Sequence, residues 1–229
     1  SMIMPDIRLD VMEKVLVVTL DRPPVNTLLL DTYRELAATF DTISLRKDVH
    51  CVVFTAAGEK AFCAGLDLKE FAAVRVEDDP ARAAVVRHCF AAIRHCALPV
   101  IAAVNGPALG AGCVLTSVCD IRIAAEKASF GLPEINVGRC GGTAHMGRHL
   151  PQGLLRRMFF TGQPITAAEA HHFGFVDRVT SLPDLLPQAM DMAKLISEKA
   201  PLGLRFGKAA LNQIDYMSVE DGYAIEQRY

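Results

Sequence analysis

Glu134 is the residue of this sequence best placed to move a proton. Phe130, Leu132, Pro133 and Ile135 surround it with apolar groups, and an apolar environment raises the pKa of a carboxyl group toward neutrality. A carboxylate tuned in this way suits the removal and return of a proton at a carbon atom. The alternative is a glutamate in the first turn of a helix that begins after Pro133, where it would only complement the helix dipole.

Three glycine-bearing segments follow strand-like runs, and glycine lets a backbone approach a ligand closely. They span residues 60–69, 105–113 and 130–142. A helix that begins near Ala111 would present unpaired NH groups to an oxygen that becomes negative, and Gly110 and Gly112 would let that oxygen approach. The alternative is that these segments are ordinary tight turns between strands and helices.

Other glycine-dependent chemistries lack their sequence signatures. The cluster of Gly106, Gly110 and Gly112 does not spell GxGxxG, and neither a GxxxxGK[ST] phosphate loop nor a GxSxG nucleophile elbow occurs. A dinucleotide-binding sheet, a nucleotide triphosphatase and a serine hydrolase are therefore disfavoured.

No metal site is expected. His145 and His149 have the spacing of a helical metal-binding pair, but the glutamate of HExxH and a third ligand are missing. His171 and His172 lie in a helical block away from the other candidate residues and receive no role. The seven cysteines form no CxxC pair and lie mostly in apolar stretches, which favours buried thiols in a reducing compartment, the cytoplasm.

Composition limits the partners. Half of the 229 residues are apolar and the net charge is -2, so we expect a globular protein with no basic surface for nucleic acid. No apolar run reaches the roughly 20 residues needed to span a bilayer, and residues 1–6 lack a signal-peptide pattern. We therefore expect neither a nucleic-acid nor a membrane partner.

The elements that must position the candidate residues alternate between strands and helices, which predicts an α/β fold. Val- and Ile-rich runs predict strands at 15–20, 51–55, 100–104, 120–124 and 175–179. Apolar periodicity predicts helices at 31–45 and 81–96, and then at 152–160, 167–173, 182–199, 203–216 and 219–228. We therefore expect a core domain over 2–165 and a helical C-terminal region over 166–229.

Four blocks resemble the enoyl-CoA hydratase/isomerase (crotonase) family in order and spacing. They are AFCAGLDL (61–68), PVIAAVNGPALGAGC (99–113), CDIRIAAEKASFGLPEINVG (119–138) and TGQPITAAEAHHFGFVDRV (161–179). The resemblance implies a spiral of ββα repeats that forms two sheets, a homotrimer or a hexamer, an acyl-CoA thioester substrate, and no cofactor beyond the CoA of that substrate. It also implies that further helices, which cover an active site, would follow Tyr229.

The resemblance assigns roles to individual residues. The backbone NH groups of Leu66 and Ala111 would hold the thioester oxygen, and Glu134 would transfer the proton. The residues that it places against the substrate or its CoA are Ala64, Gly65, Asp67, Leu68, Gly110 and Val114. Asp67 falls at a helix start, where capping is a better interpretation than catalysis.

Val114 departs from the family pattern. Hydratases of the family usually carry a second glutamate at this position, and valine cannot move a proton. Addition of water is a task that two carboxylates share, whereas one base can carry a proton from Cα to Cγ of an enoyl group. An isomerase-like reaction therefore fits Glu134 better. A hydratase with a single carboxylate or a recruited histidine, and a catalytically silent acyl-CoA-binding protein, remain as alternatives.

Overall fold

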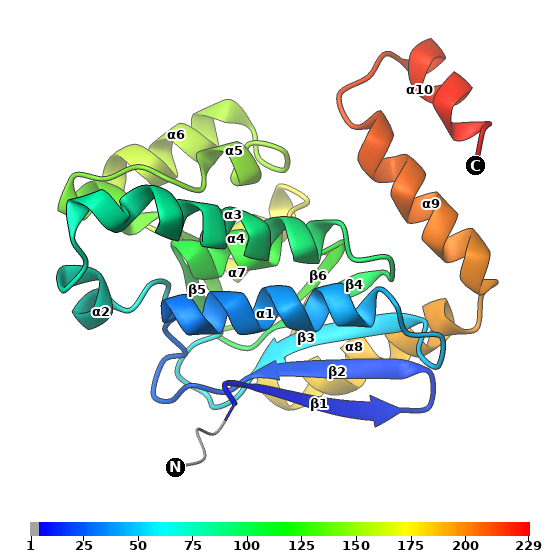
Figure 1. Ribbon diagram of the computed structural model, residues 1–229, viewed down its shortest axis with the longest axis horizontal. Coiled ribbons are helices and arrows are strands. Elements are labelled where there is room, and N and C mark those ends of the chain that lie inside the picture. The colour runs from blue at the N-terminus through cyan, green and yellow to red at the C-terminus, as the bar shows by residue number, and fades with distance from the viewer. Residues whose placement is uncertain (1–4) are drawn as a thin grey trace.

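The computed structural model describes residues 5–229. Residues 1–4, which belong to the segment 1–6 considered above for a signal peptide, lie outside the described part. Six strands form the larger sheet, in the order β1-β2-β3-β4-β6-β9 (Figure 1). They are β1 (Ile7–Met12), β2 (Val15–Leu20), β3 (Cys51–Ala56), β4 (Val100–Val104), β6 (Ile121–Ala125) and β9 (Arg178–Thr180). β1 pairs antiparallel with β2, and the other neighbouring strands of this sheet run parallel to one another. The five predicted strands are confirmed, with the last two shifted toward the C-terminus.

A second, smaller sheet contains β5 (Pro107–Leu109), β7 (Ser129–Gly131) and β8 (Ile165–Thr166), in the order β5-β7-β8. Isolated bridges extend this arrangement, because Cys63 pairs with Ala108 and Leu28 pairs with Leu66. Successive turns of the chain thus add one segment to each sheet before a helix. This is the expected spiral of ββα repeats.

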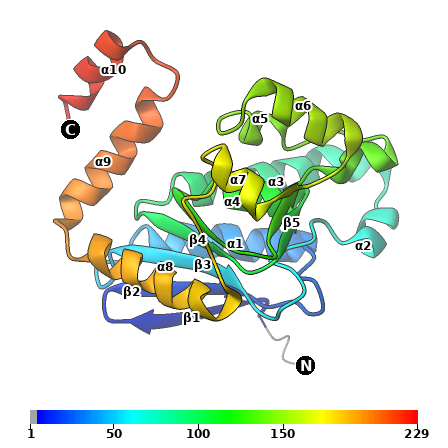
Figure 2. The ribbon, with the colours of Figure 1, turned by 180° about the vertical axis from the view of Figure 1, so that it is seen from behind.

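Helices cover both faces of the larger sheet. They are α1 (Leu30–Ile43), α2 (Leu68–Ala72), α3 (Asp79–Arg94), α4 (Ala111–Ser117), α5 (Thr143–Met146), α6 (Gln152–Thr161), α7 (Ala167–His172), α8 (Leu182–Ser197), α9 (Pro201–Ile214) and α10 (Val219–Glu226), with 3-10 turns η1 (Val76–Asp78) and η2 (Pro133–Val137). One face packs under α8, as Figure 2 shows, and the other contributes to the main core with α1 and α3. Burial on both faces explains why β2, β3 and β4 are continuous apolar runs.

The chain after residue 165 does more than add helices. The predicted boundary falls within β8, β9 pairs with β6 in the larger sheet, and α8 covers that sheet. Helices α9 and α10 project from the body as an arm (Figures 1 and 2). The division into two regions at 165 stays a prediction. No helix within residues 5–229 combines the length and the apolarity required to cross a bilayer.

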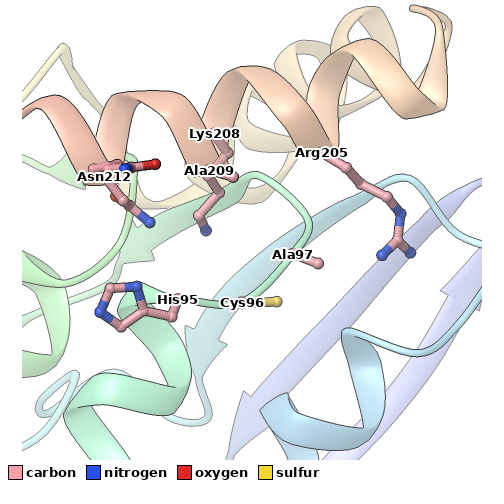
Figure 3. Close-up of a pocket in the computed structure, with 8 residues that line it drawn as sticks. His95, Cys96, Ala97, Arg205, Lys208, Ala209 and Asn212 are labelled. Carbon is pink, nitrogen blue, oxygen red and sulfur yellow. The ribbon is translucent and has the colours of Figure 1, made fainter. Parts of the chain in front are cut away.

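Polar contacts anchor the arm to the body. The buried Lys208 ammonium donates to Asp120 at 2.8 Å and to the Leu98 carbonyl at 2.9 Å, and Arg205 donates to the Ser44 carbonyl at 2.8 Å. A cavity of about 300 Å³ lies between α9 and the end of α3 (Figure 3). None of the predicted site residues lines this cavity.

Candidate active site

Two backbone segments, 63–66 and 109–112, meet at the candidate site. A Cβ atom on Gly65 would lie 2.9 Å from the Leu109 carbonyl oxygen and 3.7 Å from the Ala111 nitrogen. Gly65 has a backbone φ of +96°, which residues other than glycine rarely adopt. The structure therefore brings the two predicted amide-bearing segments together.

Gly112 makes this approach possible, for a reason that differs from the prediction. Its Cα faces protein, because a Cβ atom there would lie 2.1 Å from the Cys63 carbonyl oxygen. The expectation that Gly112 makes room for a substrate oxygen is therefore wrong. Its role is to let α4 pack against the segment that carries Leu66.

The amides of Leu66 and Ala111 are free donors. The bridge between Leu28 and Leu66 does not involve the Leu66 NH. Its two hydrogen bonds run from the Leu28 NH to the Gly65 carbonyl, at 2.8 Å, and from the Asp67 NH to the Leu28 carbonyl, at 2.9 Å. Across residues 5–229, neither the Leu66 NH nor the Ala111 NH donates to a protein acceptor. Two neighbouring segments thus each offer one unpaired backbone donor.

Glu134 lies beside these donors. A Cβ atom on Gly110 would lie 2.8 Å from Glu134 Oε1, and the Gly110 NH donates to the Gly131 carbonyl at 2.9 Å, which ties the two loops together. Glu134 Oε2 is enclosed and has no hydrogen-bond partner among the described residues. The carboxylate is therefore directed into the protein, one residue from the Ala111 amide.

Burial raises the pKa of Glu134 above its ordinary value of 4.5 through desolvation, and a backbone hydrogen bond partly opposes this. The apolar neighbours behave unequally, because Phe130 and Leu132 are fully buried whereas Ile135 is 39% exposed. The residues that precede Glu134 in the sequence therefore provide the predicted apolar environment, and Ile135 does not.

The raised pKa predicts a pH-dependent stability difference between the protein and Glu134→Gln. The folded protein holds the Glu134 proton more tightly than the unfolded chain, so this carboxyl group's contribution to stability is present below the unfolded pKa of about 4.5 and is lost as pH rises through the higher folded pKa. Glutamine does not titrate. The melting temperature of Glu134→Gln, relative to the unmodified protein, should therefore rise between about pH 4 and pH 8. A relative decrease over this range would contradict the assigned shift.

Val114 forms part of an apolar wall close to these groups. It is 3% exposed, and a Cβ atom on Gly142 would lie 3.0 Å from Val114 Cγ2 and 2.6 Å from Leu132 Cδ2. The loop before α5 therefore rests on Val114 and Leu132. This wall contributes packing where a second carboxylate would contribute proton transfer.

The segment predicted to contact CoA lies beside the loop that follows β2. Ala64 NH donates to the Val25 carbonyl at 3.0 Å. Asp67 is the N-cap of α2, accepting from the Glu70 NH at 3.0 Å and from Thr27 Oγ1 at 3.2 Å. The Glu70 NH hydrogen bond is the main cause of the lowered pKa of Asp67. Asp67 thus caps a helix, as expected, while Leu68 is largely exposed.

The histidines have structural surroundings. His149 Nε2 lies 2.9 Å from the Ser117 carbonyl, its ring packs edge-on against Phe175, and burial is the main cause of the lowering of its pKa to about 4. His149 is therefore neutral near pH 7, with its proton on Nε2. His171 and His172 are exposed on α7. Across residues 5–229, no three His, Cys, Asp or Glu side chains are grouped so as to hold a metal ion.

Two buried polar residues of the core were not singled out from the sequence. Arg122 is buried and donates to the Thr116 carbonyl at 3.0 Å and the Cys119 carbonyl at 2.8 Å, so it binds the carbonyl end of α4. Tyr33 lies on the buried face of α1 and brings a phenol hydroxyl into the core. Arginine in the strand-like run CDIRIAA was the available signal for the first; nothing in the sequence distinguished the second.

Comparison with known proteins agrees with this fold and geometry. The sequence model for enoyl-CoA hydratase/isomerase matches residues 10–229. A short-chain-enoyl-CoA hydratase of Clostridium acetobutylicum is 36% identical, over 93% of this chain and 83% of the relative. A (7aS)-7a-methyl-1,5-dioxo-2,3,5,6,7,7a-hexahydro-1H-indene-carboxyl-CoA hydrolase of Mycobacterium tuberculosis is 39% identical, over 94% of this chain and 87% of the relative.

Solved structures extend the likeness to three dimensions. An enoyl-CoA hydratase from Bacillus anthracis superposes with a TM-score of 0.93 at 34% identity, covering 97% of this chain and 88% of that chain. An enoyl-CoA hydratase from Mycobacterium smegmatis gives 0.94 at 32% identity, covering 98% and 89%. The chain belongs to the enoyl-CoA hydratase/isomerase family, and its fold is the crotonase fold. It is an acyl-CoA-processing enzyme of the hydratase/isomerase class.

Proposed function

We propose that this enzyme works through a thioester enolate, with Leu66 NH and Ala111 NH holding the oxygen and Glu134 moving the proton. The observation that carries the proposal is the position of the Glu134 carboxylate over Gly110, next to the unpaired Ala111 amide. Each backbone donor contributes about 2.7 to 4 kcal/mol when charge develops on an oxygen in a water-poor site. Gly110 makes room for the Glu134 carboxylate, and Gly65 lets the two donor segments approach each other. Ala64, Asp67 and Leu68 flank the CoA path.

The reaction that best fits a single carboxylate is migration of a double bond. Glu134 takes a proton from Cα and returns it at Cγ, and the two amides stabilise the dienolate that forms in between. Val114, which occupies the position of the family's other glutamate, contributes only an apolar surface to the acyl pocket. No cofactor enters this scheme other than the CoA of the substrate.

Hydration is a second candidate, favoured by the name of the Clostridium acetobutylicum relative, a short-chain-enoyl-CoA hydratase. In that reaction Glu134 would both activate water and protonate Cα. Its raised pKa suits both roles, since a general acid or base works best near the operating pH.

One assay separates these reactions. The protein is incubated with a panel of 2-enoyl- and 3-enoyl-CoA thioesters, and products are followed by mass and by ultraviolet absorbance. Isomerisation leaves the mass unchanged and alters the absorbance of a 3-enoyl substrate, whereas hydration adds the mass of one water molecule to a 2-enoyl substrate. Calorimetric acyl-CoA binding without turnover of any thioester would refute catalysis and leave a binding protein.

The described cysteines favour a reducing location. Six of the seven cysteines are buried and none forms a disulfide, which supports the proposal of a cytoplasmic protein. The net charge of -2 gives no basis for a nucleic-acid partner.

We also propose that the arm of α9 and α10 joins copies of this chain into a trimer or a hexamer. Leu202, Phe206 and Leu211 of α9 are 63%, 50% and 66% exposed, which is costly on an isolated surface. Sedimentation should show three or six copies, and Phe206→Asp with Leu211→Asp should reduce the assembly to monomers. Lys199→Ala, an exposed change just before α9, is the control. A monomeric unmodified protein would refute the proposal.

A further inference from the structure

Tyr33 is a buried phenol without a hydrogen-bond partner. It lies on α1, is 3% exposed, and belongs to the main core. Its hydroxyl makes no hydrogen bond with any described residue, yet it is not among the fully enclosed unpaired side-chain atoms, which are Arg94 Nε, Asn105 Oδ1 and Glu134 Oε2. The hydroxyl of Tyr33 therefore keeps a small accessible surface.

The surroundings of Tyr33 connect it with the candidate site. Its ring meets Phe90 edge-on, with centroids 6.2 Å apart, and Phe90 meets His145 edge-on at 5.3 Å. His145 belongs to α5, whose N-cap Gly142 rests on Val114. Tyr33, Phe90 and His145 thus form a row of rings that leads to the apolar wall beside Glu134.

Electrostatics supports the same placement. Burial is the main cause that raises the pKa of Tyr33 far above its ordinary value; Cys63 and Cys89 add to it, Arg82 opposes it, and the Glu134 carboxylate is close enough to add further. The phenol therefore stays neutral at any physiological pH and can donate its proton in a hydrogen bond. A donor in this position that finds no acceptor is costly.

We propose that the Tyr33 hydroxyl donates a hydrogen bond to an oxygen on the acyl chain of the substrate, and so selects oxygenated acyl-CoA thioesters over plain hydrocarbon ones. The inference rests on the proposed function, and it names the substrate class of that site. A pocket with a buried hydrogen-bonding group discriminates strongly against an analogue that leaves the group unpaired. A hydrocarbon chain would displace water from this hydroxyl and would offer no hydrogen-bond acceptor in its place.

The charged side chains near Tyr33 indicate which kind of acyl-chain oxygen its hydroxyl would bind. A carboxylate on the acyl chain would need an unpaired cation, but the nearby Arg82 is bound to Glu70, with 3.1 Å between Arg82 Nη2 and Glu70 Oε1. Glu70 Oε1 also accepts from the Leu30 NH at 2.7 Å, so this pair is fixed to the start of α1. An uncharged keto or hydroxyl oxygen therefore fits Tyr33 best.

The test compares two substrates of equal chain length in the unmodified protein and in Tyr33→Phe. Both substrates are enoyl-CoA thioesters, and one carries a keto or hydroxyl group beyond the reacting carbons. Tyr33→Phe should lower kcat/KM for the oxygenated substrate by about tenfold or more and change that of the plain substrate less than about twofold. Tyr223→Phe, which alters an exposed tyrosine on α10, should leave both values unchanged.

Each outcome bears on the proposal. An unchanged ratio between the two substrates in Tyr33→Phe, with an unchanged melting temperature, would overturn it. An equal loss on both substrates would also overturn it, because the phenol would then act on atoms common to both. If the unmodified protein turns over no thioester, the proposed function fails. Calorimetry then decides the inference, with pairs of saturated acyl-CoA thioesters that differ only in the keto or hydroxyl group. Tyr33→Phe must weaken the binding of the oxygenated member of each pair and leave that of the plain member unchanged.

Discussion

Glu134→Gln will lower kcat on an enoyl-CoA substrate by about 100- to 10,000-fold, the range that a positioned general acid or base contributes. Glutamine keeps the size of the side chain and removes the group that takes up and returns the proton. The two backbone donors at Leu66 and Ala111 remain, so KM should change much less than kcat. Steady-state kinetics on the best substrate of the thioester panel measures both constants.

The matched control is Glu126→Gln, which makes the same chemical change at an exposed position after β6. It should retain full activity. The melting temperature of Glu134→Gln should equal or exceed that of the unmodified protein near pH 7, because an enclosed carboxylate oxygen without a partner is removed. If Glu134→Gln keeps more than a tenth of the activity, another group moves the proton.

Much of the fold could be predicted because burial leaves a direct record in the sequence. Strands β2, β3 and β4 are buried on both faces, so each appears in the sequence as a largely apolar run. The capping box of Thr166 and Glu169 marks the start of α7. The same reasoning located Glu134 through its apolar neighbours and found the glycine-bearing segments.

The remainder depends on contacts that sequence periodicity does not record. Tyr33 occupies a core position of α1 at which a leucine would satisfy the same pattern, so its unpaired hydroxyl becomes visible only when α1 packs on α3. Ile135 reads as apolar cover for Glu134 but faces outward from η2. The strand predicted at 175–179 is β9, but its pairing with β6 in the larger sheet is a contact that the run itself does not record.

Gly112 illustrates how the same glycine supports two interpretations. From the sequence, it offers room for a ligand beside Ala111. In the structure, that room is occupied by the Cys63 carbonyl, 2.1 Å from the position that a Cβ atom would take. Sequence reasoning could identify the need for a small residue, but not the group that approaches it.

Gly112→Ala is therefore expected to damage both stability and catalysis. The methyl group would meet backbone atoms of Cys63 at 2.1 and 2.8 Å, and no rotamer change moves a backbone carbonyl. Overpacking of this kind costs about 1 to 3 kcal/mol or more. Relief requires α4 to move away from the segment 63–66, which separates the Ala111 amide from the Leu66 amide. A displacement of about 1 Å costs roughly 100-fold in rate.

Urea unfolding and steady-state kinetics of the purified variant measure the two effects. Gly153→Ala on α6 is the control, because a Cβ atom there meets nothing within 4 Å; it should keep full activity and leave stability unchanged or raise it by up to about 1 kcal/mol. Full activity in Gly112→Ala would show that the two amides need not stay together. A folded variant with lost activity would instead support their joint role, since Gly112 itself lies against Cys63 and touches the reaction only through the spacing of these two donors.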